Sequence, residues 1–240
     1  MKKIFLLALM LGSLAFLAMK QSPNKNNPLQ GAWKLSHNGL DYVLVFQDGY
    51  SMFTQYSLDN KKFVLTTGGP YTAEANKIKV KVQFNSADKS DAGKSFEYGY
   101  KIDGDALTTE TGNGFSLTWE RIDEGDKNLA GNWRIIQRKQ DDQMVDIPLR
   151  ARRTLKLLTS TRFQWAAINI ETGEFFGTGG GTYTFKKGKY IENIDFFSRD
   201  STRVGMSLNF EGKLDNGNWI HSGKSSKGDP IYEVWSRMKE

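Results

Sequence analysis

A short motif occurs twice in this chain, and the two copies lie one hundred residues apart. The segment LQGAWKLS occupies 29–36, and the related segment LAGNWRII occupies 129–136. Further copies follow in the same order, namely FVLTTGGPYT with FFGTGGGTYT (63–72 and 175–184), IKVKVQFNS with YIENIDFFS (78–86 and 190–198), and TWERI with VWSRM (118–122 and 234–238). Ordered repeats of this kind indicate two tandem domains of one fold.

The repeats also set the domain boundaries. We predict a signal peptide at 1–18, a flexible leader at 19–28, a first domain at 29–123, a charged linker at 124–128 and a second domain at 129–240. The leader contains two prolines among polar residues, which is typical of flexible segments.

The N-terminus predicts export. Two lysines precede an apolar run at 4–18, and its fifteen residues reach only ~22 Å as a helix, short of a ~30 Å hydrocarbon core. A signal peptide therefore explains the run better than its alternative, an uncleaved anchor. The chain has no cysteine, so it has neither a disulfide nor a thiol for lipid attachment. We expect a periplasmic or secreted protein without a stable membrane span.

Both copies show the period of β-strands. Ile78, Val80 and Val82 alternate with lysine and glutamine, as in a strand with one buried face. Turn segments such as QDG, DGD, GNG and DNGN separate these stretches. We count about eight strands in each copy and predict an all-β protein of two tandem antiparallel up-and-down barrels, since closure removes exposed sheet edges.

The ends of each copy carry a further pattern. A Gly-x-Trp on the first strand and an arginine on the last strand resemble the lipocalin (calycin) family, here as Gly31, Trp33 and Arg121, and as Gly131, Trp133 and Arg237. The resemblance implies that each arginine packs across its tryptophan and closes one end of the barrel. Both copies are shorter than a typical lipocalin and lack its common disulfide. They are therefore more similar to compact tandem lipocalin-like proteins exported by bacteria, with a smaller cavity or a filled one.

No catalytic or metal-binding pattern is present. The two histidines, His37 and His221, lie in different copies, and no Gly-x-Ser-x-Gly occurs. We therefore expect no cofactor, no metal and no enzymatic activity. The sequence pI is about 9.3, but the densest basic cluster (Arg150, Arg152, Arg153 and Lys156) is short. We interpret it as a solvated loop or strand edge and expect no nucleic-acid partner.

Glu192 is the most unusual residue on a predicted inner face. It shares that face with Tyr190 and Ile194, and the first copy has Val80 at this position. One interpretation is a polar anchor for a ligand, with Trp165, Tyr183 and Met206 as apolar walls. The alternative is an internal salt bridge, for example to Arg162, or exposure at the strand end. We expect an exported non-catalytic protein that binds a small apolar or amphipathic ligand, with the second lumen favoured. The alternative is a pair of filled barrels that serve as a protein-interaction or cell-envelope accessory module.

Overall fold

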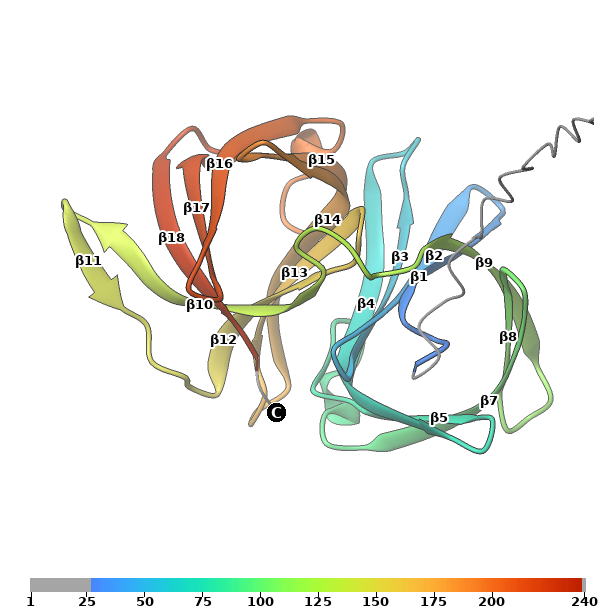
Figure 1. The fold of residues 1–240 in the computed structure, drawn as a ribbon. Coiled ribbons are helices and arrows are strands. Elements are labelled where there is room, and N and C mark those ends of the chain that lie inside the picture. The colour runs from blue at the N-terminus through green and yellow to red at the C-terminus, as the bar shows by residue number, and fades with distance from the viewer. Residues whose placement is uncertain (1–26, 239–240) are drawn as a thin grey trace, which may run out of the picture.

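The structure, a computed structural model, describes residues 27–238. The predicted signal peptide and most of the predicted leader lie outside the described residues. The described chain forms two closed antiparallel β-barrels of eight strands each, which lie side by side (Figure 1). The predicted fold class is thereby confirmed. Within 27–238, no helix is long and apolar enough to cross a membrane.

The first barrel closes where its first strand meets its last. It contains β1 (Gly31–His37), β2 (Leu40–Gln47), β3 (Tyr50–Ser57), β4 (Lys62–Glu74), β5 (Lys77–Lys81), β6 (Phe84–Asn85), β7 (Ser95–Asp103), β8 (Ala106–Glu110) and β9 (Ser116–Asp123). β1 pairs with β9, and β5 and the short β6 both pair with β4, so that together they form one position of the ring.

The second barrel repeats this plan. It contains β10 (Gly131–Gln140), β11 (Gln143–Asp146), β12 (Arg152–Leu158), β13 (Arg162–Asn169), β14 (Glu174–Lys186), β15 (Lys189–Phe197), β16 (Ser207–Asp215), β17 (Asn218–Lys224) and β18 (Pro230–Arg237). β10 pairs with β18 and closes the ring, whereas β11 pairs only with the far end of β10. One short 3₁₀ helix occurs in each half, η1 (Lys89–Asp91) and η2 (Ser201–Arg203).

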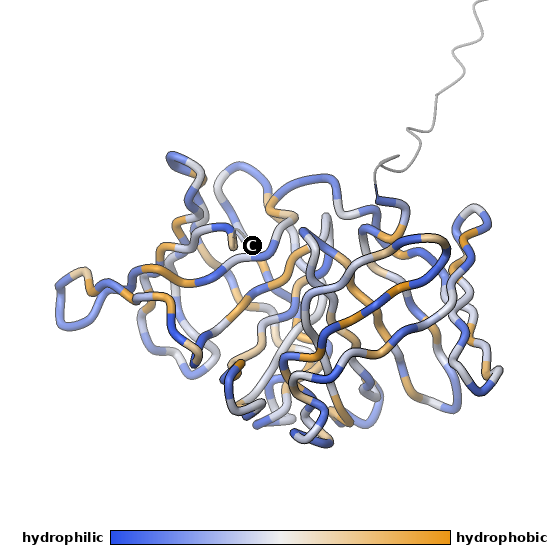
Figure 2. The backbone as a smooth tube through the Cα atoms, turned by 90° about the horizontal axis from the view of Figure 1, so that it is seen from below, coloured by the Kyte–Doolittle hydropathy of each residue, from blue (hydrophilic) through white to orange (hydrophobic). Residues whose placement is uncertain are grey.

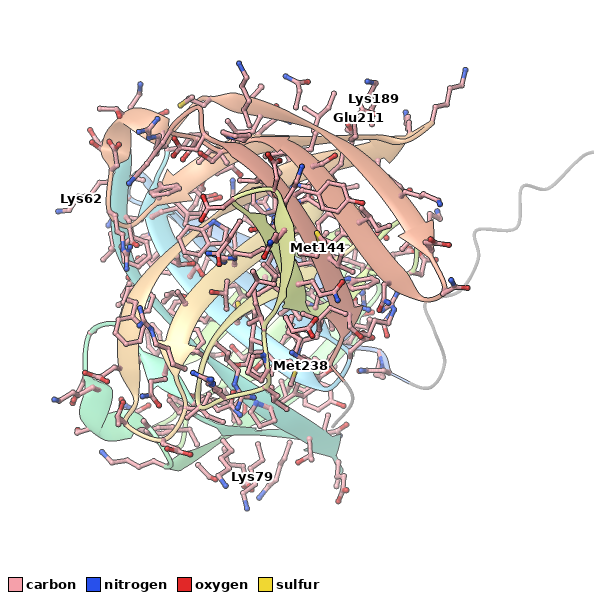
Figure 3. The ribbon with its side chains drawn as sticks, turned by 90° about the vertical axis from the view of Figure 1, so that its left-hand side faces the viewer. Lys62, Lys79, Met144, Lys189, Glu211 and Met238 are labelled. Atoms are coloured by element: carbon pink, nitrogen blue, oxygen red, sulfur yellow. The ribbon has the colours of Figure 1, made fainter. Side chains whose placement is uncertain are left out.

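Local sequence explains the strands and turns. On β5, Ile78 is buried inside the barrel while Lys77, Lys79 and Lys81 are exposed, and Lys79 points away from the protein (Figure 3). Hydrophobic residues run along the strands, and the turns are mostly hydrophilic (Figure 2). The turn at Asn38 and Gly39 has positive φ at both residues, 50° and 74°, which matches the right-handed twist of the strands that it joins.

The repeated glycines permit close strand contacts. A Cβ atom on Gly69 would lie 2.0 Å from the backbone oxygen of Lys81, and one on Gly181 would lie 2.0 Å from that of Asn193. The pairing of β14 with β15 shifts register between Gly180 and Gly181. The glycine-rich segment of β14 is therefore a bulge in the barrel wall.

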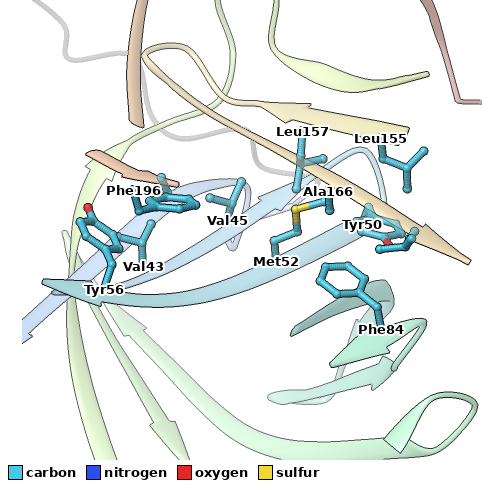
Figure 4. Packing of buried hydrophobic residues seen from close by; sticks show 12 residues of the cluster. Val43, Val45, Tyr50, Met52, Tyr56, Phe84, Leu155, Leu157, Ala166 and Phe196 are labelled. Carbon is cyan, nitrogen blue, oxygen red and sulfur yellow. The ribbon is translucent and has the colours of Figure 1, made fainter. Parts of the chain in front are cut away.

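The two barrels share an apolar interface. Residues on the outer faces of β2, β3 and β6 pack against residues on the outer faces of β12, β13 and β15 (Figure 4), and the buried cluster includes Val45, Met52, Phe84, Leu157 and Phe196. Near its centre, Gln164 accepts a hydrogen bond from Thr54 at 2.8 Å and donates one to Thr66 at 2.9 Å. The barrels thus form one packed unit.

This interface has approximate two-fold symmetry. Phe63 and Phe175 occupy equivalent positions, 112 residues apart, and their rings stack at 6.3 Å. Phe84 and Phe196 are also equivalent, and the contacts Phe63–Phe196 (6.4 Å) and Phe84–Phe175 (6.1 Å) exchange under the same symmetry. Each barrel therefore uses the same patch, as subunits do in an isologous dimer.

Candidate functional site

Each barrel has one end closed by an arginine on a tryptophan. The Arg121 guanidinium carbon lies 3.8 Å from the centroid of the Trp33 ring, and that of Arg237 lies 4.6 Å from the Trp133 ring. The indole nitrogens of both tryptophans donate at 2.8 Å to a backbone oxygen four residues earlier, Leu29 or Leu129. The structure brings together both pairs that the sequence suggested.

The two predicted glycines make room at these closed ends. Gly31 has φ +113°, and a Cβ atom there would lie 2.0 Å from the backbone oxygen of Asp123. A Cβ atom on Gly131 would lie 2.1 Å from the Nη1 atom of Arg237. Any side chain at these positions would displace β9 or the arginine, so the Gly-x-Trp pattern is needed for closure.

The lumen of the first barrel contains a cavity of about 320 Å³. Its wall comes from β2 to β9 and η1 and is mostly apolar, with Leu44, Phe46, Phe53, Ile78, Val80, Val82, Phe96, Tyr98, Leu117 and Trp119 as its large apolar and aromatic residues. The volume is at the lower end of the range for ligand sites in proteins, about 300–1,000 Å³. This lumen is therefore large enough for a small ligand.

Polar side chains in the wall of this cavity are bonded to the protein. Ser51 and Thr67 donate hydrogen bonds to the backbone oxygens of Gly69 and Phe84, at 3.2 and 3.0 Å. Thr109 accepts from the indole nitrogen of Trp119 at 2.9 Å. Ser51 and Thr67 have therefore used their donor hydrogens within the protein, and their remaining capacity is that of uncharged acceptors.

Buried aromatic side chains pack together in the second lumen. Tyr190, Trp219 and His221 are each at most 2% exposed, and Trp219 contacts the rings of Trp133 and Trp235 at 5.9 Å. Trp165 and Met206, two of the predicted ligand residues, belong to the same apolar cluster, and Trp165 packs edge-on against Phe197. Tyr183 lies toward the closed end, where its hydroxyl donates to the Thr159 oxygen at 2.6 Å.

Glu192 is an ion-pair partner inside this packed lumen. Its Oε1 atom lies 2.6 Å from the Nζ atom of Lys156 and accepts a hydrogen bond from the Tyr190 hydroxyl at 2.7 Å. Both charged side chains are 6% exposed. The nitrogen of Lys156 also lies 5.4–5.5 Å from the ring centroids of Phe163, Tyr190, Trp219 and Trp235.

Two interpretations from the sequence are corrected here. Lys156 does not belong to a solvated basic cluster, because its position on β12 directs it into the lumen. Arg162 is not the partner of Glu192, because it lies on the outer face of β13. There it donates to Asp195 at 2.7 Å and to the Tyr56 hydroxyl at 3.2 Å.

Equivalent positions differ in side-chain size and charge between the two lumens. Leu44 and Val80, which line the cavity, correspond to Lys156 and Glu192 in the second barrel. Several further lumen positions carry larger side chains in the second barrel, among them the pairs Ser51 and Phe163, Ile78 and Tyr190, Leu107 and Trp219, and Thr109 and His221. The expected preference of a ligand for the second lumen remains a prediction, whereas the cavity described above lies in the first barrel.

The sequence analysis overlooked the cavity residues of the first barrel. Leu44, Phe53, Ile78 and Val80 are ordinary core residues in a strand pattern, and no single one attracts attention. Comparing side-chain sizes between the two copies at each inward position would have identified them.

A second concave region lies outside the second barrel. Residues 138–150, which we call the arm, include β11 and correspond to the increase in repeat spacing from 100 to 112 residues. An open groove of about 520 Å³ runs between the arm and the outer wall of β17 and β18, lined in part by Met144, Ile220, Tyr232 and Val234. Met144 lies in front of this wall (Figure 3).

The residues that can ligate metals do not gather in the described chain. Between residues 27 and 238, no group of three or more His, Cys, Asp or Glu side chains could hold a metal ion. His37 is exposed at the end of β1, and His221 is buried in the second lumen.

The fold and the cavity together define the class of protein. It is a tandem pair of closed eight-stranded antiparallel barrels with a cavity in the first lumen. This arrangement is consistent with a tandem lipocalin-like fold. Neither a family model nor a curated protein matches this sequence.

Proposed function

We propose that this protein is an exported, non-catalytic binding protein of lipocalin-like kinship that holds a small apolar or amphipathic molecule in its first barrel. The observation that supports this function is the cavity of about 320 Å³ with its mostly apolar wall. Burial of apolar ligand surface, at roughly 25 cal/mol per Å², supplies the affinity. Export rests on the N-terminal apolar run of the sequence.

The second barrel has a different part in this proposal. Its lumen contains a packed aromatic cluster, and its outer face supports the first barrel through the symmetric interface. It also carries the arm, where Met144, Val145 and Leu149 are 40–54% exposed. Exposed apolar residues on an added segment favour a second candidate function, contact with a protein partner.

The experiment measures binding of an environment-sensitive apolar dye, and its displacement by a panel of apolar ligands. A Val80→Phe variant adds a ring to the wall of the cavity, and we expect at least tenfold weaker binding. Lys79→Phe is the matched control, because it adds the same ring to the outer face of the same strand. Unchanged dye binding in Val80→Phe, or no binding to the wild type, would contradict the proposal.

A further inference from the structure

The polar chemistry at the open end of the first barrel specifies the head group of the ligand, if the proposed function holds. The open end lies opposite the Trp33–Arg121 closure. Arg121 donates its backbone N–H to Asp105, in the turn after β7, at 2.8 Å, so that turn lies at the closed end. The beginning of β7 and the preceding helix η1 therefore lie at the other end of the lumen.

Asp91, on η1, is the charged residue in the wall of the cavity. Its carboxylate accepts one hydrogen bond from the Asn85 side chain at 2.8 Å and one from Lys94 at 3.0 Å. A carboxylate can accept about four hydrogen bonds, so Asp91 retains acceptor capacity for a ligand. Its side chain is 23% exposed, as expected for a group at the mouth.

The positive charge that pairs with Asp91, that of Lys94, lies outside the cavity wall. The residues that line it include no lysine or arginine, and Lys94, the partner of Asp91, is 55% exposed. The pKa of the nearby Tyr98 hydroxyl is raised, first by burial and then by the charge of Asp91. A head group in the cavity therefore faces the Asp91 carboxylate and not the Lys94 ammonium, which favours a hydrogen-bond donor over an anion.

The volume of the cavity limits the apolar part. A water molecule occupies about 30 Å³ in the liquid, and a methylene group is of similar size, so about 320 Å³ holds roughly ten such groups. Asp91 is the charged acceptor among the lining residues, so the mouth is the most favourable place for a polar end that donates hydrogen bonds.

We propose that the ligand is a single-chain amphiphile of about ten carbons, whose head group is a hydroxyl or an ammonium that donates to Asp91. The chain enters the lumen first, and the head group stays at the mouth. Carboxylate amphiphiles of the same length are disfavoured by Asp91.

The test compares decan-1-ol, decylammonium and decanoate as competitors of the dye on the wild-type protein. We expect decylammonium and decan-1-ol to bind at least tenfold more tightly than decanoate. Alkyl alcohols of increasing length should gain about fourfold in affinity for each methylene, from ~0.8 kcal/mol each, and stop gaining near ten to twelve carbons.

The variant Asp91→Asn removes the charge at nearly constant size. We expect it to weaken decylammonium binding about tenfold and to strengthen decanoate binding, with little change for the alcohol. Asp88→Asn is the matched control, since Asp88 caps the same helix and carries the same charge but does not line the cavity. A melting temperature for each variant verifies folding.

The outcomes separate this inference from the proposed function. If the wild type does not bind the dye, the proposed function fails. If the dye binds the lumen but none of the three compounds displaces it, only the assigned ligand is wrong. If decanoate binds as tightly as decylammonium, or if Asp91→Asn and Asp88→Asn behave alike, the head-group assignment is wrong while the lumen remains the site. A continued gain in affinity beyond fourteen carbons would overturn the assigned chain length.

Discussion

Lys156 and Glu192 form an ion pair inside the second barrel, with 2.6 Å between Nζ and Oε1. The first barrel has Leu44 and Val80 at the two equivalent positions, and both line its cavity. The same two sites therefore hold a charged pair in a packed lumen and apolar walls in an open one. Because the charges are buried, neither partner is expected to tolerate loss of the other.

The single variant Glu192→Val should lower the free energy of unfolding by about 3–5 kcal/mol, since Lys156 keeps a buried charge without its partner. The double variant Lys156→Leu with Glu192→Val restores the apolar pair of the first barrel and should recover most of that loss. Urea denaturation of Glu192→Val, of Lys156→Leu and of the double variant measures the coupling energy between the two side chains. Additive effects would show that the pair does not act as a unit.

The two arginine–tryptophan closures should differ in strength. The Arg121 side chain is 4% exposed and donates to the backbone oxygens of Gln30 and Pro28, at 2.9 and 2.8 Å, whereas Arg237 is 45% exposed and donates to Asp48. We expect Arg121→Met to cost about 2–4 kcal/mol and Arg237→Met about 1 kcal/mol or less. Urea unfolding followed by tryptophan fluorescence tests this order, and a larger cost at Arg237 would contradict it.

His221 should make the protein sensitive to acid. Burial lowers its pKa below the usual value near 6.5, although the Glu233 carboxylate at 3.6 Å acts in the opposite direction. Well above pH 6.5 the imidazole is neutral in both states and contributes no pH dependence. As the pH falls below 6.5, the histidine of the unfolded chain takes up a proton, whereas His221 of the folded chain does so only at its lower pKa. The free energy of unfolding therefore decreases as the pH is lowered, by up to about 1.4 kcal/mol per pH unit.

The measurement is urea denaturation between pH 7.5 and 4.5 for the wild type and His221→Gln. The variant should show a shallower fall in stability below pH 6.5. The exposed His37→Gln serves as the control for loss of a histidine. Equal slopes in the wild type and His221→Gln would remove His221 as the cause.

The symmetric interface should couple the unfolding of the two barrels. Phe84 is fully buried and contacts Phe175 across the interface at 6.1 Å. We expect Phe84→Ala to cost about 3–5 kcal/mol, and Phe115→Ala, at a 60% exposed turn residue, to cost less than about 0.5 kcal/mol. In the wild type, circular dichroism and tryptophan fluorescence should report one coincident transition, whereas two separate transitions would show that the barrels unfold independently.

The sequence was sufficient to predict the two barrels and their closures. Alternation such as Ile78 and Val80 against Lys77 and Lys79 fixes which face of a strand is buried, and the turn residues fix where the chain reverses. The repeated glycines, tryptophans and arginines marked the same contacts in both halves, because these contacts depend on residue types at strand ends.

Only the tertiary structure decided which residue pairs with Glu192 and how much space each lumen leaves. Glu192 bonds to Lys156, 36 positions earlier, because β12 and β15 face each other across the lumen. The alternation of residues along a strand shows that both side chains point inward, but it does not show which inward side chains meet. Whether a lumen is open depends on the summed sizes of side chains from all eight strands, so it emerges only when the ring closes. Sequence pattern thus determined which residues point inward, and three-dimensional packing determined what space they leave.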